Sequence, residues 1–187
     1  MNNELGKWDN YYKDLSLGEG PKLYADQTTY LMAAAFFVGE GTVEDWGCGR
    51  GGFRLFCLNE TYTGLDGSKT LFADKIVDLC SYRSNPDCIL IRHILEHNYN
   101  WRDILDNAVA SFRRKLCLVL FTPFAEQTKE IAHYRNSGID VPDISFSRSD
   151  IEQRFAGLKW RLASNIATSS QYGIEHVYFV WRDENGV

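Results

Sequence analysis

The chain has 187 residues, of which 44% are hydrophobic and 24% are charged. This length and balance predict a single domain, residues 1–187, that buries a core of its own. The net charge of −5 disfavours nucleic acid as a partner, because phosphate binding needs a basic surface.

The start of the chain lacks the basic residues and the apolar run of a secretory signal, and the longest apolar run, 31–38, is too short to span a bilayer. Five cysteines are scattered along the chain without a Cys-x-x-Cys pair. These features predict a cytoplasmic protein with reduced thiols and no membrane partner. No pattern in the sequence indicates an oligomeric state.

Residues 1–40 are expected to form a lid segment and one helix ahead of the core. The helix is expected to begin at Asp26 or Thr28 and to stop at Gly39. Four aromatic residues precede it among polar neighbours, and the three tyrosines are expected to form a lid or one wall of a substrate site: Trp8, Tyr11, Tyr12 and Tyr24.

The run 42–53, Thr-Val-Glu-Asp-Trp-Gly-Cys-Gly-Arg-Gly-Gly-Phe, is the most informative part of the chain. A strand at about 42–46 breaks into glycines, and an apolar helix is expected at about 52–58. Alternate glycines let the backbone turn sharply and let a ligand lie against bare peptide. Gly47, Gly49 and Gly52 also satisfy the dinucleotide pattern Gly-x-Gly-x-x-Gly. Asp45 favours a cofactor with ammonium and sulfonium groups over one with a pyrophosphate.

Two acids follow at the expected ends of the next strands. Asp66 ends a short strand at 61–66, where a carboxylate can accept hydrogen bonds from two ribose hydroxyls. It also suits a turn before Gly67. Asp78 follows the third strand, where it is either a ligand or a simple strand-end acid. The connection 67–74 is short, so this crossover is expected to be a single turn.

A fourth apolar strand, 88–91, runs into the polar sequence Arg-His-Ile-Leu-Glu-His-Asn. His93, Glu96 and His97 match the inverted zinc-protease signature, which requires a helix through the motif. The strand-like residues before it argue against zinc, and no metal site is expected. Local packing is favoured over catalysis for Glu96 and His97.

The rest of the chain continues the alternation of helices and strands. A helix capped by Asn100 precedes a buried strand at 116–121, and 125–147 shows no regular pattern. Ser149 and Glu152 form an expected capping box before two final strands, at about 158–162 and 172–182. This order predicts an α/β fold whose mostly parallel sheet ends in an antiparallel strand pair.

Residues 42–182 resemble class I S-adenosylmethionine (SAM)-dependent methyltransferases, whose first motif ends in Asp-x-Gly-Cys-Gly-x-Gly. The resemblance implies a three-layer Rossmann-like core, SAM as cofactor, and methyl transfer to a small-molecule substrate. It implies that His93 faces the methyl group as a catalytic base and that Arg92 offers its backbone carbonyl. The cofactor-binding residues that it implies are Asp45, Gly47, Cys48, Gly49, Gly51, Asp66, Gly67, Asp78, Leu79 and Arg92.

Three other functions remain open at this point. The chain could keep the cofactor site as a regulatory protein that transfers nothing. A nicotinamide enzyme would need a second nucleotide-binding half for which the chain is short. A zinc hydrolase would use His93, Glu96 and His97. The methyl acceptor is not indicated by the sequence.

Overall fold

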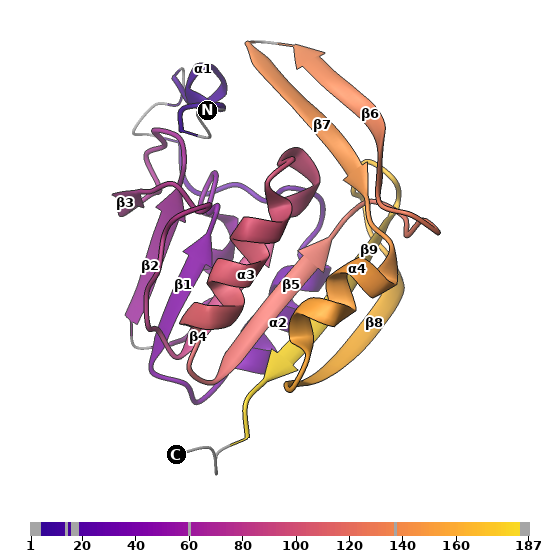
Figure 1. The fold of residues 1–187 in the computed structure, drawn as a ribbon. Coiled ribbons are helices and arrows are strands. Elements are labelled where there is room, and N and C mark those ends of the chain that lie inside the picture. Colours follow the sequence, from indigo (N-terminus) through magenta and orange to yellow (C-terminus); the bar gives the residue numbers. More distant parts are fainter. Residues whose placement is uncertain (1–4, 14, 16–18, 60, 137, 184–187) are drawn as a thin grey trace.

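The computed structural model describes residues 5–13, 15, 19–59, 61–136 and 138–183, and its main feature is a seven-stranded sheet in the order β3-β2-β1-β4-β5-β9-β8 (Figure 1). The first five of these strands are mutually parallel, and β9 runs antiparallel to both of its neighbours, β5 and β8. The strands are β1 (Thr42–Trp46), β2 (Thr61–Asp66), β3 (Lys75–Ile76), β4 (Cys88–Arg92), β5 (Lys115–Leu120), β6 (Lys129–Asn136), β7 (Ile139–Ser145), β8 (Lys159–Ala167) and β9 (Ile174–Trp181). The helices are α1 (Asp9–Tyr12), α2 (Thr28–Phe37), α3 (Trp101–Ser111) and α4 (Arg148–Glu152), with 3₁₀ turns η1 (Gly52–Leu55), η2 (Leu95–His97) and η3 (Gln153–Phe155).

The two faces of the sheet carry separate cores because side chains alternate along each strand. In β4, Ile89 and Ile91 pack with α3 and α4 on one face. Cys88 and Leu90 pack with α2 on the other. All of β4 is buried, as a parallel strand covered on both sides must be. The three-layer α/β architecture and the C-terminal antiparallel pair expected from the sequence are therefore confirmed.

The segment after the glycines differs from the expected helix. Only the four-residue turn η1 forms there, against about seven residues expected at 52–58. The chain leaves this turn at Phe56, and Leu58 is 85% exposed. An amphipathic helix would bury that side chain. The helix predicted from the apolar composition of this stretch was therefore too long.

Two helix caps also differ from expectation. Ser147, rather than Ser149, caps α4 by accepting a hydrogen bond from the Asp150 N–H at 3.2 Å. Asn100 does precede α3, but its side chain forms no capping bond. The local sequence therefore predicted the positions of both helices correctly but not the capping interactions at their N-termini.

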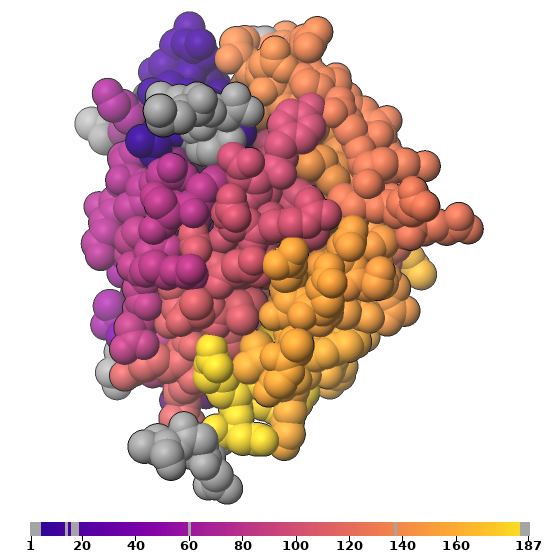
Figure 2. Space-filling model, viewed as in Figure 1, coloured from indigo at the N-terminus to yellow at the C-terminus, as the bar shows by residue number. Residues whose placement is uncertain are grey.

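The hairpin β6–β7 was not expected from the sequence. It rises from the end of the sheet where β1, β2, β4 and β5 terminate, and the N-terminal segment (residues 5–13) lies at the same end (Figures 1 and 2). The two touch at the hairpin tip, where a Cβ on Gly138 would come within 2.7 Å of the Asn10 side chain. Among the described residues, no helix has the length and apolarity needed to cross a bilayer.

Candidate functional site

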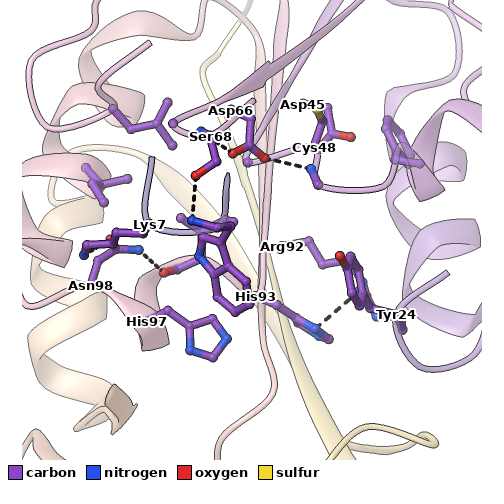
Figure 3. Close-up of a pocket in the computed structure, with 18 of the residues that line it drawn as sticks. Lys7, Tyr24, Asp45, Cys48, Asp66, Ser68, Arg92, His93, His97 and Asn98 are labelled. Atoms are coloured by element: carbon purple, nitrogen blue, oxygen red, sulfur yellow. Dashed lines mark hydrogen bonds between the residues drawn. The ribbon is translucent and has the colours of Figure 1, made fainter. Parts of the chain in front are cut away.

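A cavity of about 320 Å³ opens at the carboxyl ends of the parallel strands, between the N-terminal segment and η2 (Figure 3). Crevices at this edge are where open α/β sheets bind ligands. Ten of the residues singled out from the sequence line it: Asp45, Gly47, Cys48, Gly49, Asp66, Gly67, Asp78, Leu79, Arg92 and His93.

Gly51 is the exception among the implied cofactor-binding residues, because it does not line the cavity. Its φ of +71° and its bridge to Lys22 make it part of the turn itself. A Cβ there would lie 3.0 Å from the Phe72 ring. The third glycine of the motif is therefore required by backbone geometry rather than by contact with the cavity.

The amides of the glycine turn are not bare, contrary to expectation. The Leu65 carbonyl accepts the N–H groups of Gly47 and Cys48 at 2.7 and 2.8 Å. Asp66 Oδ2 accepts the N–H of Gly49 at 2.9 Å. The turn is thus fixed in place by β2, and what it offers a ligand is close approach to a backbone without side chains.

Asp45 and Asp66 are buried carboxyls at the tips of neighbouring strands. Burial, opposed by a hydrogen bond from the Tyr62 hydroxyl, raises the pKa of Asp45 to about 7. Burial also raises the pKa of Asp66 to about 6, although hydrogen bonds from backbone N–H groups, including those of Ser68 and Gly49, oppose the rise. Such paired, perturbed acids in a crevice mark a functional site more often than a structural one.

Asp78 and Leu79 form the far end of the cavity. Asp78 Oδ1 accepts the N–H of Cys80 at 2.9 Å, so part of this carboxylate holds its own turn. The Leu79 carbonyl accepts a hydrogen bond from Asn107, whereas the Leu79 N–H donates to no described residue. Leu79 lines the cavity, so a ligand there can supply the acceptor that its N–H requires.

Arg92 enters the site through its side chain as well as its backbone. Its guanidinium is buried and lies 2.9 Å from Glu175 Oε1, and it donates to Thr29 Oγ1, to the Tyr30 hydroxyl and to the Tyr24 carbonyl. This side chain is a structural centre that joins β4, α2 and β9. Sequence reasoning considered only its carbonyl.

His93 lines the cavity with a φ of +58°, in the left-handed region that few side chains adopt. An Arg92 N–H faces its Nδ1 at 3.4 Å, and an arginine can only donate, so the ring proton lies on Nε2. Nε2 is 3.0 Å from Glu175 Oε1. Burial, followed by the charge of Arg92, lowers the pKa of His93 to about 4. In neutral His93 the lone pair on Nδ1 therefore already faces an N–H of Arg92, which disfavours His93 as a base.

His97 is the functional candidate that sequence reasoning set aside. It lines the cavity from η2 and contacts the rings of Trp8 and Phe121, whose centroids are each 5.4 Å from its own. Its Nδ1 lies 3.0 Å from the Pro142 carbonyl and 3.4 Å from Asp143 Oδ1. These partners belong to β7, a strand that was not expected, so the local motif that contains His97 gave no indication of its hydrogen-bond partners.

Other lining residues come from segments that carried no motif. Lys7 and Trp8 reach the cavity from the N-terminal segment, together with Tyr12 and Tyr24. The β8–β9 loop contributes Ser169, Ser170 and Gln171, and η2 contributes Asn98. The tyrosine wall expected from the sequence is thus present in part, without Tyr11.

The zinc-protease alternative does not match the geometry. His93 follows a strand, and only a 3₁₀ turn spans Leu95–His97, where that motif requires a helix. Glu96 is fully buried, and its Oε1 accepts the N–H of Phe121 at 2.6 Å instead of facing the cavity. No group of three or more His, Cys, Asp or Glu side chains in the described part of the chain is arranged to hold a metal.

Comparison with solved structures identifies the fold. No family model matches the chain, and no curated protein matches it significantly. It is similar to the 1,6-didemethyltoxoflavin N1-methyltransferase of Burkholderia thailandensis with bound 1,6-didemethyltoxoflavin and S-adenosylhomocysteine (SAH), at 14% identity, a TM-score of 0.64, and coverage of 84% of this chain and 77% of that one. It is also similar to the magnesium protoporphyrin IX methyltransferase of Synechocystis PCC 6803 with bound SAM, at 16% identity, a TM-score of 0.60 and coverage of 84% and 79%.

A third similar structure is the N-methyltransferase NodS of Bradyrhizobium japonicum WM9 in complex with SAH, at 12% identity, a TM-score of 0.58 and coverage of 84% and 86%. Identities this low carry no residue-level correspondence. The likeness establishes that the chain has the fold of the class I SAM-dependent methyltransferases, as expected from the sequence.

Proposed function

We propose that the protein is a SAM-dependent methyltransferase acting on a small-molecule acceptor. The observation that carries the proposal is the meeting of three acids with the glycine turn in one cavity. Asp45, Asp66 and Asp78 come from three successive parallel strands or the loops that follow them, and all line the same space. Fold alone would not select this function.

The lining residues fit the proposed cofactor group by group. Asp66 is the acceptor for ribose hydroxyls, and Asp78 with the Leu79 N–H is the partner for an adenine edge. The carboxylate of Asp45 is the partner for the positive charge of the methionine end. This end of the cofactor would also lie against the backbone of Gly47–Gly49 and donate a hydrogen bond to the carbonyl of Arg92. A cationic ligand favours the ionised form of Asp45 and offsets the burial that raises its pKa.

The bound cofactor supplies an electrophilic methyl group on a sulfonium. The task of the chain is to align an acceptor with that methyl and to keep water out. Alignment of this kind contributes about 7–11 kcal/mol of barrier reduction. Trp8, Tyr12 and Tyr24, which form the aromatic wall, are the residues that would cover the site.

A small molecule is the proposed acceptor because the cavity is a crevice of about 320 Å³ at one end of the sheet. Two of the similar structures are named for small-molecule substrates, 1,6-didemethyltoxoflavin and magnesium protoporphyrin IX. We also propose a cytoplasmic location, which is supported by five free thiols without a disulfide.

Calorimetric titration with SAM, SAH and NAD⁺ tests the proposal. We expect SAM and SAH to bind and NAD⁺ not to bind. Absence of SAM and SAH binding at millimolar ligand would refute it. A regulatory protein that binds SAM without using it remains the second candidate, favoured by the missing helix between β2 and β3. Release of SAH from SAM in the presence of an acceptor would exclude that candidate.

A further inference from the structure

We infer that His97, oriented by the Pro142 carbonyl and with Asp143 close to its Nδ1, is the general base of the proposed methyl transfer, and that the acceptor is a planar aromatic compound carrying an acidic O–H or ring N–H. This inference rests on the proposed function. It is drawn from the tautomer of His97, the burial of Asp143, and the two aromatic rings next to the imidazole.

The backbone fixes which nitrogen of His97 carries the proton. The Pro142 carbonyl can only accept a hydrogen bond, so Nδ1, 3.0 Å away, must donate. In the neutral ring Nε2 then holds the lone pair. No described residue donates to Nε2, and it is absent from the buried atoms that lack a partner, so this lone pair is accessible from the cavity that His97 lines. His93 shows the opposite arrangement, with its lone pair on Nδ1 facing Arg92.

Asp143 is placed to stabilise the charged form of His97. Its side chain is almost fully buried, and Oδ1 lies 3.4 Å from His97 Nδ1 without a hydrogen bond to any described residue. Oδ2 accepts hydrogen bonds from Gln171 and from the Tyr172 hydroxyl, both at 2.9 Å. Burial raises the pKa of Asp143, but interactions with His97, Tyr172 and Gln171 outweigh it and hold the pKa below its usual range. A carboxylate this close to an imidazole stabilises the imidazolium that forms when the ring takes up a proton, while the Pro142 carbonyl orients the ring.

The other ionisable groups around His97 do not compete for the same proton. Glu96 turns away to the N–H of Phe121, and burial raises the pKa of its carboxyl to about 7. Lys7 donates to Asn98 Oδ1 at 3.1 Å. His93 has a pKa lowered to about 4 by burial and by Arg92. His97 is therefore the base with an available lone pair among the described ionisable residues of this end of the cavity.

The walls around His97 indicate the shape of the acceptor. Trp8 and Phe121 line the cavity beside His97, with Trp8 edge-to-face to the imidazole and both ring centroids 5.4 Å from that of His97. Flat rings are well accommodated between aromatic side chains. An imidazole is also matched in basicity to phenols and acidic ring N–H groups, whereas an aliphatic hydroxyl is far too weak an acid for efficient proton transfer to it.

The step balances without a further reactant. The acceptor O–H or N–H gives its proton to His97 Nε2, and the electron pair on oxygen or nitrogen forms the new bond to the methyl carbon. The carbon–sulfur bond breaks, and its electron pair stays on sulfur as the neutral thioether. The imidazolium, stabilised by Asp143, then returns its proton to solvent.

The test uses 4-nitrophenol, whose phenolate absorbs in the visible range, added to protein saturated with SAH at a pH one unit below the ionisation of the free phenol. In the unmodified protein we expect the ratio of ionised to neutral phenol to be about tenfold higher for the bound than for the free compound, because the phenolate lies beside the His97 imidazolium; this change corresponds to about 1.4 kcal/mol. His97→Gln should bind the phenol in its neutral form, Asp143→Asn should give an intermediate signal, and cyclohexanol should not displace the phenol. His133→Gln, an exposed histidine on β6, is the matched control and should behave as the unmodified protein.

Calorimetry with SAH separates this inference from the proposed function. All four proteins should bind SAH within about twofold, because neither His97 nor Asp143 is among the cofactor contacts. Loss of SAH binding by the unmodified protein refutes the proposed function. Normal SAH binding without phenol binding refutes the acceptor class, and equal ionisation by His97→Gln refutes the base. Nitrogen-15 NMR gives an independent readout, since the Nδ1–H tautomer is expected for His97 and the Nε2–H tautomer for His93.

Discussion

Asp66 stabilises the glycine turn, because its two oxygens accept hydrogen bonds from the N–H groups of Gly49 and Ser68. We propose that the same carboxylate also accepts hydrogen bonds from the cofactor ribose. We expect Asp66→Asn to weaken SAH binding about 10- to 100-fold, since hydrogen bonds to a charged acceptor are worth about 1.5–3 kcal/mol. The amide keeps one acceptor oxygen for the turn, so the fold should persist. Calorimetry measures the change, with exposed Glu126→Gln as the control. Equal affinity would rule out contact between Asp66 and the ribose.

Two buried acids make the stability of the ligand-free protein depend on pH. Burial raises the pKa of Asp45 and of Glu96 to about 7, so the folded state keeps their protons after the unfolded state has lost them. From pH 6.5 to 7.5 the unfolded chain therefore binds fewer protons, and the free energy of unfolding should fall as the pH rises. Buried histidines such as His93 act in the opposite direction, but mainly below pH 6.5.

Urea unfolding at pH 6.5 and 7.5 measures this fall. Asp45→Asn should reduce the slope, because an amide does not ionise while it can still accept the Tyr62 hydroxyl. A stability that rises over this interval would contradict the assignment.

At this scale the sequence identified the residues that act through local spacing and missed those that act through distant partners. Asp45, Asp66 and the glycines follow from strand and turn patterns. His97 acquires its tautomer from Pro142, 45 positions later. No local pattern carries that information, because it depends on how β7 packs against η2.

Among the elements, the hairpin and the short turn η1 were the least predictable. All of β6 is exposed, and β7 contains Pro142, so neither shows the apolar alternation that indicates a strand. By contrast β4 and β5 are continuous apolar runs, and their positions followed from the sequence to within one residue.

The N-terminal segment is tied to the ribose end of the proposed site. The Gly6 N–H donates to the Gly67 carbonyl and the Trp8 N–H to Ser68 Oγ, both at 2.8 Å, and Asp9 accepts the N–H of Lys69 at 2.7 Å. A chain lacking residues 1–13 should fold, since few core side chains are lost, and should release SAH about tenfold faster. Stopped-flow dissociation measures this rate. Leu58→Ala, at an exposed site outside the cavity, should leave it unchanged, and equal rates for the truncated chain would show that the segment is not a lid.

For the whole molecule, ligand binding should appear as a gain in stability. SAH at one hundred times its dissociation constant adds about 2.7 kcal/mol to the free energy of unfolding. For a chain of this length that raises the melting temperature by about 5–10 °C. Differential scanning calorimetry should show this shift with SAM or SAH and none with NAD⁺; a shift with NAD⁺ instead would identify a different cofactor class.

The buried ion pair of Arg92 and Glu175 makes folding of the site depend on synthesis of the C-terminal part of the chain. Arg92 belongs to a strand made halfway along the chain, whereas its carboxylate arrives with β9, the last strand, and inserts between β5 and β8. Until residue 175 has left the ribosome, the nascent chain holds a guanidinium with no counterion in what will become its interior, and an unpaired buried charge is strongly destabilising. The cavity can therefore mature only after translation has passed β9, and polypeptides interrupted before that strand should remain substrates for chaperones and proteases.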